Sequence, residues 1–140
     1  MNEKKRVLIL CTGNSARSQM AEGLLREMGG DKFEVESAGV APSSVRSEAV
    51  EAMREVGIDI SGHRSKSVDE FGGQQFDYII TVCDNAKENC PVFPGQAKRI
   101  HQSFEDPPPE TVGGYESRLK IFRRVRDEIR GWLHEFSAKN

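Results

Sequence analysis

Near its beginning the chain reads Val7-Leu8-Ile9-Leu10-Cys11-Thr12-Gly13-Asn14-Ser15-Ala16-Arg17-Ser18. The unbroken apolar run at the start of this stretch predicts a buried strand over Arg6–Leu10. The apolar residues that follow recur at helical spacing and predict a helix over Ala16–Met28, which Gly29 would end. A strand that passes through a short loop into a helix is a building unit of α/β folds.

The loop between this strand and this helix begins with a thiol and closes with a guanidinium. Gly13 and Asn14 tolerate the positive φ angles that a tight anion-binding loop needs. Backbone N–H groups, the helix N-terminus and Arg17 would surround a tetrahedral oxyanion, with Cys11 beneath it as the nucleophile. Positive charge lowers the pKa of a cysteine, so we expect a thiolate here. Alternatively, Cys11 is a small core residue and Arg17 a solvated helix residue.

The rest of the chain alternates strand and helix patterns. Further strands are expected at Phe33–Ser37, Tyr78–Val82 and Lys98–His101, and further helices at Val45–Val56, from Ser67 onward and at Glu116–Phe136. The proline-rich run from Pro107 to Gly114 predicts a surface loop. Strands separated by helices imply a parallel sheet covered on both faces. The predicted fold is therefore a single α/β domain over residues 1–140, with three α/β/α layers and a four-stranded parallel sheet.

Composition narrows the function classes. The chain has 140 residues, of which 36% are hydrophobic and 30% charged, and its net charge is −2. This length and composition are typical of a globular domain with one hydrophobic core. The slightly negative net charge gives no support for nucleic-acid binding. The apolar runs are too short to span a membrane, and the one after the basic start is too short for a signal peptide. We therefore expect a cytoplasmic protein, in which three cysteines favour redox or nucleophilic use over structural disulfides.

Two further cysteines follow the third predicted strand. Cys83 comes directly after it, as Cys11 comes after the first, so both are expected at the same edge of the sheet. Cys90 lies seven residues later, about 10 Å away in a helix. Because a disulfide needs Cα atoms within roughly 7 Å, the pair could close only if this polar segment unwinds. The alternatives are a core Cys83 with an incidental Cys90, or a zinc site that includes His101, for which the spacing is unusual.

Asp106 precedes Pro107 and is therefore held near extended geometry. It would stand at the start of a stiff loop after the fourth strand, at the same edge of the sheet as Cys11. A carboxyl group in that place could protonate a leaving oxygen. The alternative is a solvated loop aspartate.

Together these residues resemble the thioredoxin-coupled arsenate reductases, which share the fold of the low-molecular-weight protein tyrosine phosphatases. The resemblance covers essentially the whole chain and is carried by Cys11–Gly23, Glu36–Gly39, Gly57–Ser61, Thr81–Cys83, Asn89–Pro91 and Asp106-Pro107. Phosphatases of this fold usually carry aromatic residues after Asp-Pro, whereas this chain continues with Pro108-Pro109. That departure favours a reductase, and a phosphatase is the alternative.

The resemblance implies a mechanism and its residues. Arsenate would bind in the loop formed by Cys11, Thr12, Gly13, Asn14, Ser15, Ala16, Arg17 and Ser18. Cys11 would attack arsenic and Asp106 would protonate the departing oxygen. Cys83 would attack Cys11, Cys90 would attack Cys83, and thioredoxin would reduce the final disulfide. The family needs no cofactor. We expect a monomer without a nucleic-acid or membrane partner.

Some relatives hold a potassium ion with residues matching Asn14, Glu22, Ser37 and an aspartate. Lys66 aligns with that aspartate. We expect its ammonium to replace the ion, and the alternative is a solvated surface lysine.

A third class of function, a non-catalytic arsenite or metal sensor, has no DNA-binding motif to support it.

Overall fold

The computed structural model describes residues 4–84, 86 and 93–140, and its strands form one parallel sheet. The strands are β1 (Lys5–Cys11), β2 (Phe33–Gly39), β3 (Tyr78–Thr81) and β4 (Lys98–His101), in the order β2-β1-β3-β4. The helices are α1 (Arg17–Gly29), α2 (Ser47–Arg54) and α4 (Tyr115–Lys139), with a 3-10 helix, η1, at Val68–Phe71. The predicted four-stranded parallel sheet is confirmed.

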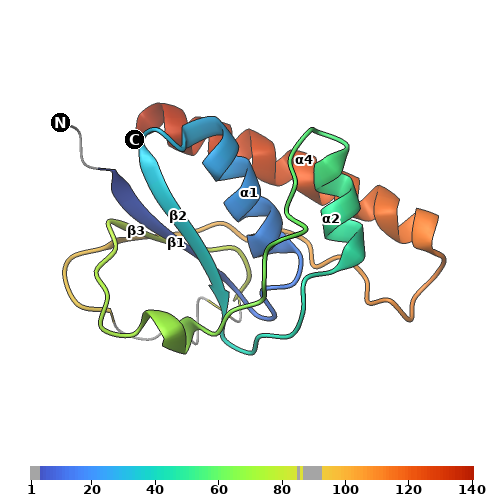
Figure 1. Cartoon of the computed structure of the whole chain (residues 1–140), viewed down its shortest axis with the longest axis horizontal. Helices are drawn as coiled ribbons and strands as arrows, with labels where there is room; N and C mark the ends of the chain where they lie inside the picture. Colours follow the sequence, from blue (N-terminus) through green and yellow to red (C-terminus); the bar gives the residue numbers. More distant parts are fainter. Residues whose placement is uncertain (1–3, 85, 87–92) are drawn as a thin grey trace.

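The sheet lies between two layers. Figure 1 shows α1, α2 and α4 together on one side of the sheet, with η1 on the other. The run Val7–Leu10 of β1 is fully buried, as expected for a strand covered on both faces. The stripe predicted for the last helix is also buried; it consists of Leu119, Phe122, Val125, Ile129, Leu133 and Phe136. Burial of these two patterns holds the layers together and fixes the edge of the sheet from which Cys11 emerges.

Several boundaries differ from the predicted ones for local reasons. The helix predicted over Val45–Val56 is shorter, because Arg46 has extended backbone angles (φ −73°, ψ 137°) and serves as the N-cap residue of α2. The helix predicted from Ser67 is the single turn η1, in which the Ser67 hydroxyl accepts a hydrogen bond from the Asp69 amide (3.1 Å). Strands β1 and β2 are longer than expected because Cys11 and Gly39 still pair.

A buried carboxylate joins α2 to α4. The side chain of Glu48 is fully buried, and its Oε2 accepts from Arg46 (2.8 Å) and from Arg118 on α4 (2.8 Å). Burial alone raises the pKa of Glu48, but the hydrogen bonds from the two guanidinium groups outweigh it and lower this pKa from 4.5 to about 2. Since the folded-state pKa lies below the unfolded one, ionised Glu48 stabilises the fold above pH 4.5.

We therefore expect a specific loss of stability in acid. This contribution, up to about 3 kcal/mol, should disappear as the pH falls from 4.5 towards 2. Glu48→Gln should be less stable than the unmodified protein at pH 7, and the difference should narrow across this pH range. Denaturant unfolding at a series of pH values measures it; a difference that does not change with pH would contradict the assignment.

No helix among the described residues is both long and apolar enough to cross a membrane.

Candidate active site

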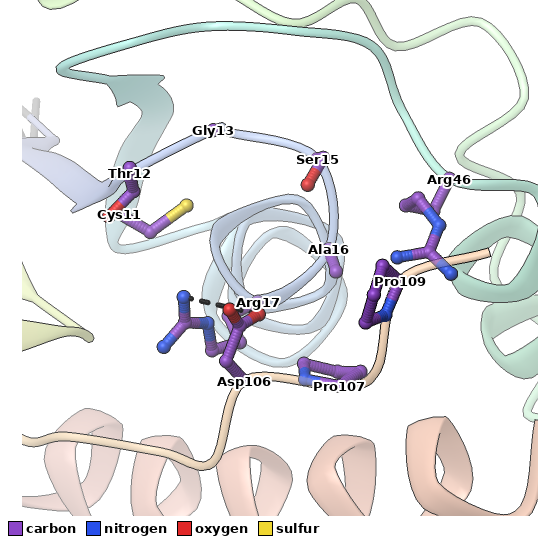
Figure 2. Close-up of a pocket in the computed structure, with 10 residues that line it drawn as sticks. All are labelled: Cys11, Thr12, Gly13, Ser15, Ala16, Arg17, Arg46, Asp106, Pro107 and Pro109. Atoms are coloured by element: carbon purple, nitrogen blue, oxygen red, sulfur yellow. Dashed lines mark ion pairs between the residues drawn. The ribbon is translucent and has the colours of Figure 1, made fainter. Parts of the chain in front are cut away.

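The loop after β1 forms one wall of a pocket of about 320 Å³. Figure 2 shows the loop curving around the end of α1, with the segment from Asp106 to Pro109 on the facing side. The lining residues are Cys11, Thr12, Gly13, Ser15, Ala16, Arg17, Arg46, Asp106, Pro107 and Pro109. The structure thus brings the predicted nucleophile, the predicted guanidinium and the predicted acid around one cavity.

The Cys11 sulfur is almost completely buried at the base of this pocket. Only 2% of Cys11 is exposed, and its Sγ lies 2.8 Å from the Ser18 Oγ and accepts the Asn14 N–H at 3.2 Å. Burial raises the pKa of the Cys11 thiol, and the Ser18 hydrogen bonds, the Arg17 charge and the Asn14 N–H lower it by less. The predicted lowering of this pKa is therefore wrong for the structure described. The groups that stabilise the thiolate are present as expected, but the burial of the sulfur outweighs them and determines the direction of the pKa shift.

The peptide groups of the loop are oriented for anion binding. The Thr12, Gly13 and Ser15 carbonyls accept hydrogen bonds from the amides of Ala41, Ser43 and Arg46, which lie outside the loop. In a trans peptide the C=O and N–H groups point in opposite directions. The N–H groups of the following residues therefore point inward, and that of Asn14 indeed donates to Cys11. Inward N–H groups beside a helix N-terminus suit a phosphate-like oxyanion.

Asn14 and Ser18 lie behind the loop, fully buried and outside the pocket lining. Asn14 has φ 47°, and its Nδ2 donates to the hydroxyl groups of Ser18 (2.7 Å) and Ser37 (2.9 Å). A Cβ at Gly39 would lie 2.5 Å from the Thr12 carbonyl oxygen, so the end of β2 must be glycine for the loop to pack against it. The side chains of Asn14 and Ser18 therefore support the loop and the sulfur, whereas the lining residues face the cavity.

Arg17 connects the loop to the segment after β4. Its Nη1 donates to the Phe104 carbonyl (3.1 Å), and its Nη2 lies 3.4 Å from Asp106 Oδ1. Figure 2 shows this ion pair at the side of the pocket below Cys11. Because the guanidinium is nearly buried, with 10% of the side chain exposed, it carries a fixed positive charge at the cavity wall. Asp106 itself is 75% exposed.

Cys83 lies beside the loop, at the same edge of the sheet as Cys11. It is buried, and its Sγ lies 3.3 Å from the Thr12 Oγ1 and accepts the Ala86 N–H at 3.4 Å. Cys11 and Cys83 are both free thiols. Cys90 lies outside the described residues, so its place in a relay stays a prediction.

Both ring nitrogens of His101 contact residues at the same edge of the sheet. Its Nδ1 lies 2.7 Å from the Thr81 Oγ1 and its Nε2 lies 2.9 Å from Asp84 Oδ1. Within residues 4–84, 86 and 93–140, no three His, Cys, Asp or Glu side chains are grouped as metal ligands.

Lys66 takes a buried place behind the loop and is not a solvated surface lysine. Its Nζ lies 3.3 Å from Glu22 Oε1 and 3.2 Å from Glu36 Oε2, and only 9% of Lys66 is exposed. Ser37 donates to the same Glu22 oxygen (2.6 Å), and Arg26 pairs with the other carboxylate oxygen (2.7 Å). With an ammonium already on Glu22, these residues do not fit a potassium site.

We therefore expect the activity to be independent of potassium. Exchange of potassium for sodium at constant ionic strength should leave turnover and melting temperature unchanged, because Lys66 supplies the charge that balances Glu22. Lys66→Asp should create potassium dependence in both measurements. A strong stimulation of the unmodified protein by potassium would contradict this assignment.

Sequence reasoning missed three lining residues, Arg46, Pro107 and Pro109. The sequence predicts only a surface loop at the prolines, and it predicts Arg46 within the helix Val45–Val56, where nothing indicates that it faces the pocket. Arg46 reaches it because its own amide donates to the Ser15 carbonyl (2.9 Å), which places the residue against the loop. That contact joins segments about thirty residues apart in the chain, and no local pattern encodes it.

Comparison with known proteins agrees with the geometry of this site. The family model described as low molecular weight phosphotyrosine protein phosphatase matches residues 6–139. An arsenate reductase of Bacillus subtilis is 44% identical over 135 residues, which cover 96% of each chain. A structure titled an arsenate reductase in oxidized state has a TM-score of 0.80 at 33% identity, covering 96% of this chain and 98% of the other.

A low molecular weight protein tyrosine phosphatase from T. tengcongensis also superimposes, with a TM-score of 0.79 at 29% identity, covering 98% of this chain and 100% of the other. This likeness over nearly the whole chain confirms the predicted fold class. The match of the family model to nearly the whole chain shows that this protein belongs to the low molecular weight phosphotyrosine protein phosphatase family.

Proposed function

We propose that the protein reduces arsenate to arsenite with Cys11 as nucleophile and with Cys83 and Cys90 as relay thiols. The observation that carries the proposal is the second buried thiol beside the anion loop: Cys83 Sγ lies 3.3 Å from the hydroxyl of Thr12, the residue next to Cys11. Hydrolysis of a phosphate ester requires no such thiol. Relatives of 42–45% identity are named arsenate reductases, which supports the same assignment.

The first step forms a bond between Cys11 Sγ and arsenic. Arsenate lies in the loop with its oxygens on the inward N–H groups and beside Arg17. As the sulfur attacks, the proton of the thiol passes to an oxygen of the bound oxyanion. Asp106 delivers a proton to the departing hydroxyl oxygen, which leaves as water while the As–O bond breaks.

The next steps transfer two electrons to arsenic. Cys83 attacks Cys11, so an S–S bond forms, the S–As bond breaks and its electron pair stays on arsenic, which leaves as arsenite. Cys90 then attacks Cys83 and releases Cys11 as a thiol. Thioredoxin, as a dithiol, reduces the Cys83–Cys90 disulfide and closes the cycle. We propose that the chain works as a single-domain monomer in the cytoplasm, without a cofactor.

Phosphatase activity is the second candidate, because the loop, Arg17 and Asp106 would serve phosphoryl transfer equally well. The mouth of the pocket, however, is lined by Arg46, Pro107 and Pro109, and no aromatic side chain is among the lining residues that the structure describes. An aryl phosphate would lack a ring to stack on. Sensing of arsenite without turnover is the third candidate.

Two assays run on the same preparation separate these functions. Arsenate-dependent oxidation of NADPH, measured with thioredoxin and thioredoxin reductase, should show multiple turnovers. Hydrolysis of p-nitrophenyl phosphate should be slower by at least about 100-fold in kcat/KM, a difference of about 3 kcal/mol. Fast ester hydrolysis without arsenate reduction would assign a phosphatase, and stoichiometric arsenite binding without turnover would assign a sensor.

Replacement of the proposed acid should slow one step only. Asp106→Asn removes the proton donor and keeps the size of the side chain, so we expect the single-turnover rate to fall about 100-fold. The rate at which iodoacetamide alkylates Cys11 should stay the same. A single-turnover rate equal to that of the unmodified protein would make Asp106 a loop residue.

A further inference from the structure

Arg46 contacts the two halves of the candidate active site. Its backbone N–H donates to the Ser15 carbonyl of the nucleophile loop (2.9 Å), and its Nη2 donates to the Pro108 carbonyl (3.0 Å). Figure 2 shows its side chain beside Pro109, on the segment that carries Asp106. Arg17 holds this segment before Asp106, at the Phe104 carbonyl, and Arg46 holds it after Asp106, so the position of the acid relative to the Cys11 loop depends on both.

Buried Glu48 holds the Arg46 guanidinium in place. Its two oxygens lie 2.8 Å from Nη2 and 3.3 Å from Nε of Arg46, and the guanidinium carbon lies 5.1 Å from the centre of the Phe122 ring. This fork-like contact fixes the plane of the guanidinium, and the ring limits its movement. Nη2 is thereby directed at the Pro108 carbonyl.

Glu48 also fixes the other end of the segment that carries Asp106, near Gly113. Its Oε2 accepts from Nε of Arg118 (2.8 Å), and Nη1 of Arg118 donates to the Gly113 carbonyl (2.8 Å). One buried carboxylate thus orients two guanidinium groups, and each of them holds a backbone carbonyl of the segment 106–114. Asp106 precedes the first of these carbonyls by two residues, and Pro107 and Pro108 restrict the backbone between them, so the fixed Pro108 carbonyl limits where Asp106 can lie.

The direct contact of Asp106 with the site is weak by comparison. Its carboxylate is 75% exposed and lies 3.4 Å from Arg17. Exposed ion pairs do little to fix a side chain, because solvent screens the charges and the side chains lose freedom. The backbone that carries Asp106 must therefore supply most of the positioning.

We propose that Glu48 is a positioning residue for the acid: through Arg46 it sets the distance between Asp106 and the oxyanion held by the Cys11 loop. This inference rests on the proposed role of Asp106 as proton donor. Neither Glu48 nor Arg46 takes part in proton transfer or electron transfer. A shift of about 1 Å in a proton donor is enough to slow its step substantially.

A double-mutant cycle tests the proposal. The single-turnover rate with arsenate is measured for the unmodified protein, Glu48→Gln, Asp106→Asn and the double variant. We expect Glu48→Gln to slow the unmodified protein about ten-fold, and to change the rate of Asp106→Asn by less than about two-fold. Cys11 alkylation by iodoacetamide should be the same in all four proteins.

Arg126→Gln is the matched control. Arg126 also joins α4 to the α2 region, through Glu55 (3.0 Å) and the Ala52 carbonyl (2.8 Å), but at the other end of α2. We expect this variant to lose comparable thermal stability and to keep its single-turnover rate within about two-fold. If Glu48→Gln does not fold, Arg46→Lys enters the same cycle, because it keeps the charge beside Glu48 and loses the fork that reaches Pro108.

An unchanged rate in Glu48→Gln, an equal loss in the Asp106→Asn background, or an equal loss in Arg126→Gln would each overturn the positioning role and leave the proposed function intact. An unchanged rate in Asp106→Asn would instead remove the proton donor from the proposed function, and the positioning role with it.

Discussion

Cys11→Ser is expected to abolish arsenate reduction, with a loss of at least about 10⁴-fold in turnover. Serine keeps the size of the residue and can still meet the Ser18 hydroxyl and the Asn14 N–H, at the positions where Sγ has partners at 2.8 Å and 3.2 Å. Cys83 cannot form a disulfide with a serine oxygen, so no bond pair can be left on arsenic and no route to arsenite remains.

The control for this variant is its fold. Thermal unfolding should stay close to that of the unmodified protein, because the side chain is isosteric and its partners remain. Arsenite production, measured with thioredoxin present, should fall below detection. Near-normal turnover of Cys11→Ser would reject the whole assignment of the site.

Arg17→Lys tests the role of the guanidinium group in the same pocket. Two nitrogens of Arg17 make separate contacts, to Phe104 and to Asp106, and one ammonium cannot reproduce that fork. We expect a strong loss of activity, at least about 100-fold, with the charge retained.

Cys90→Ser is expected to produce at most one arsenite per protein molecule. Without the third thiol, Cys83 has no intramolecular partner to release it from Cys11, and the protein stops after the first transfer of electrons. Arsenite yield against protein concentration, measured without added small thiols, gives the stoichiometry. Cys83→Ser is the matched control and should release no arsenite, because its defect precedes the reduction of arsenic. Full multiple turnover by Cys90→Ser would remove Cys90 from the relay.

The strand pattern and the rules for parallel sheets were sufficient to predict how the site assembles. Cys11, Cys83 and the segment of Asp106 each follow a strand, and the carboxyl ends of parallel strands share one edge, so their meeting could be expected without coordinates. Helix ends were predicted less well, since Arg46 takes an extended conformation to reach Ser15 and so delays α2.

Properties that depend on depth and on distant contacts could not be predicted in this way. The pKa of Cys11 was expected to fall because the charges near it are visible in the sequence, whereas its burial is not. The burial of Lys66 could be predicted only from the alignment with relatives, because a lysine is usually exposed. The clamp formed by Glu48, Arg46 and Arg118 joins three segments of the chain and has no local signature.

The most direct measurement of the central claim is a peptide mass map of Cys90→Ser after exposure to arsenate. The variant is digested under acidic conditions, with free thiols blocked beforehand, and the disulfide-linked peptides are identified. The relay predicts one dominant species, in which the peptide with Cys11 is joined to the peptide with Cys83, in an amount equal to the arsenite released. Arsenite release with both of these thiols found free would contradict it.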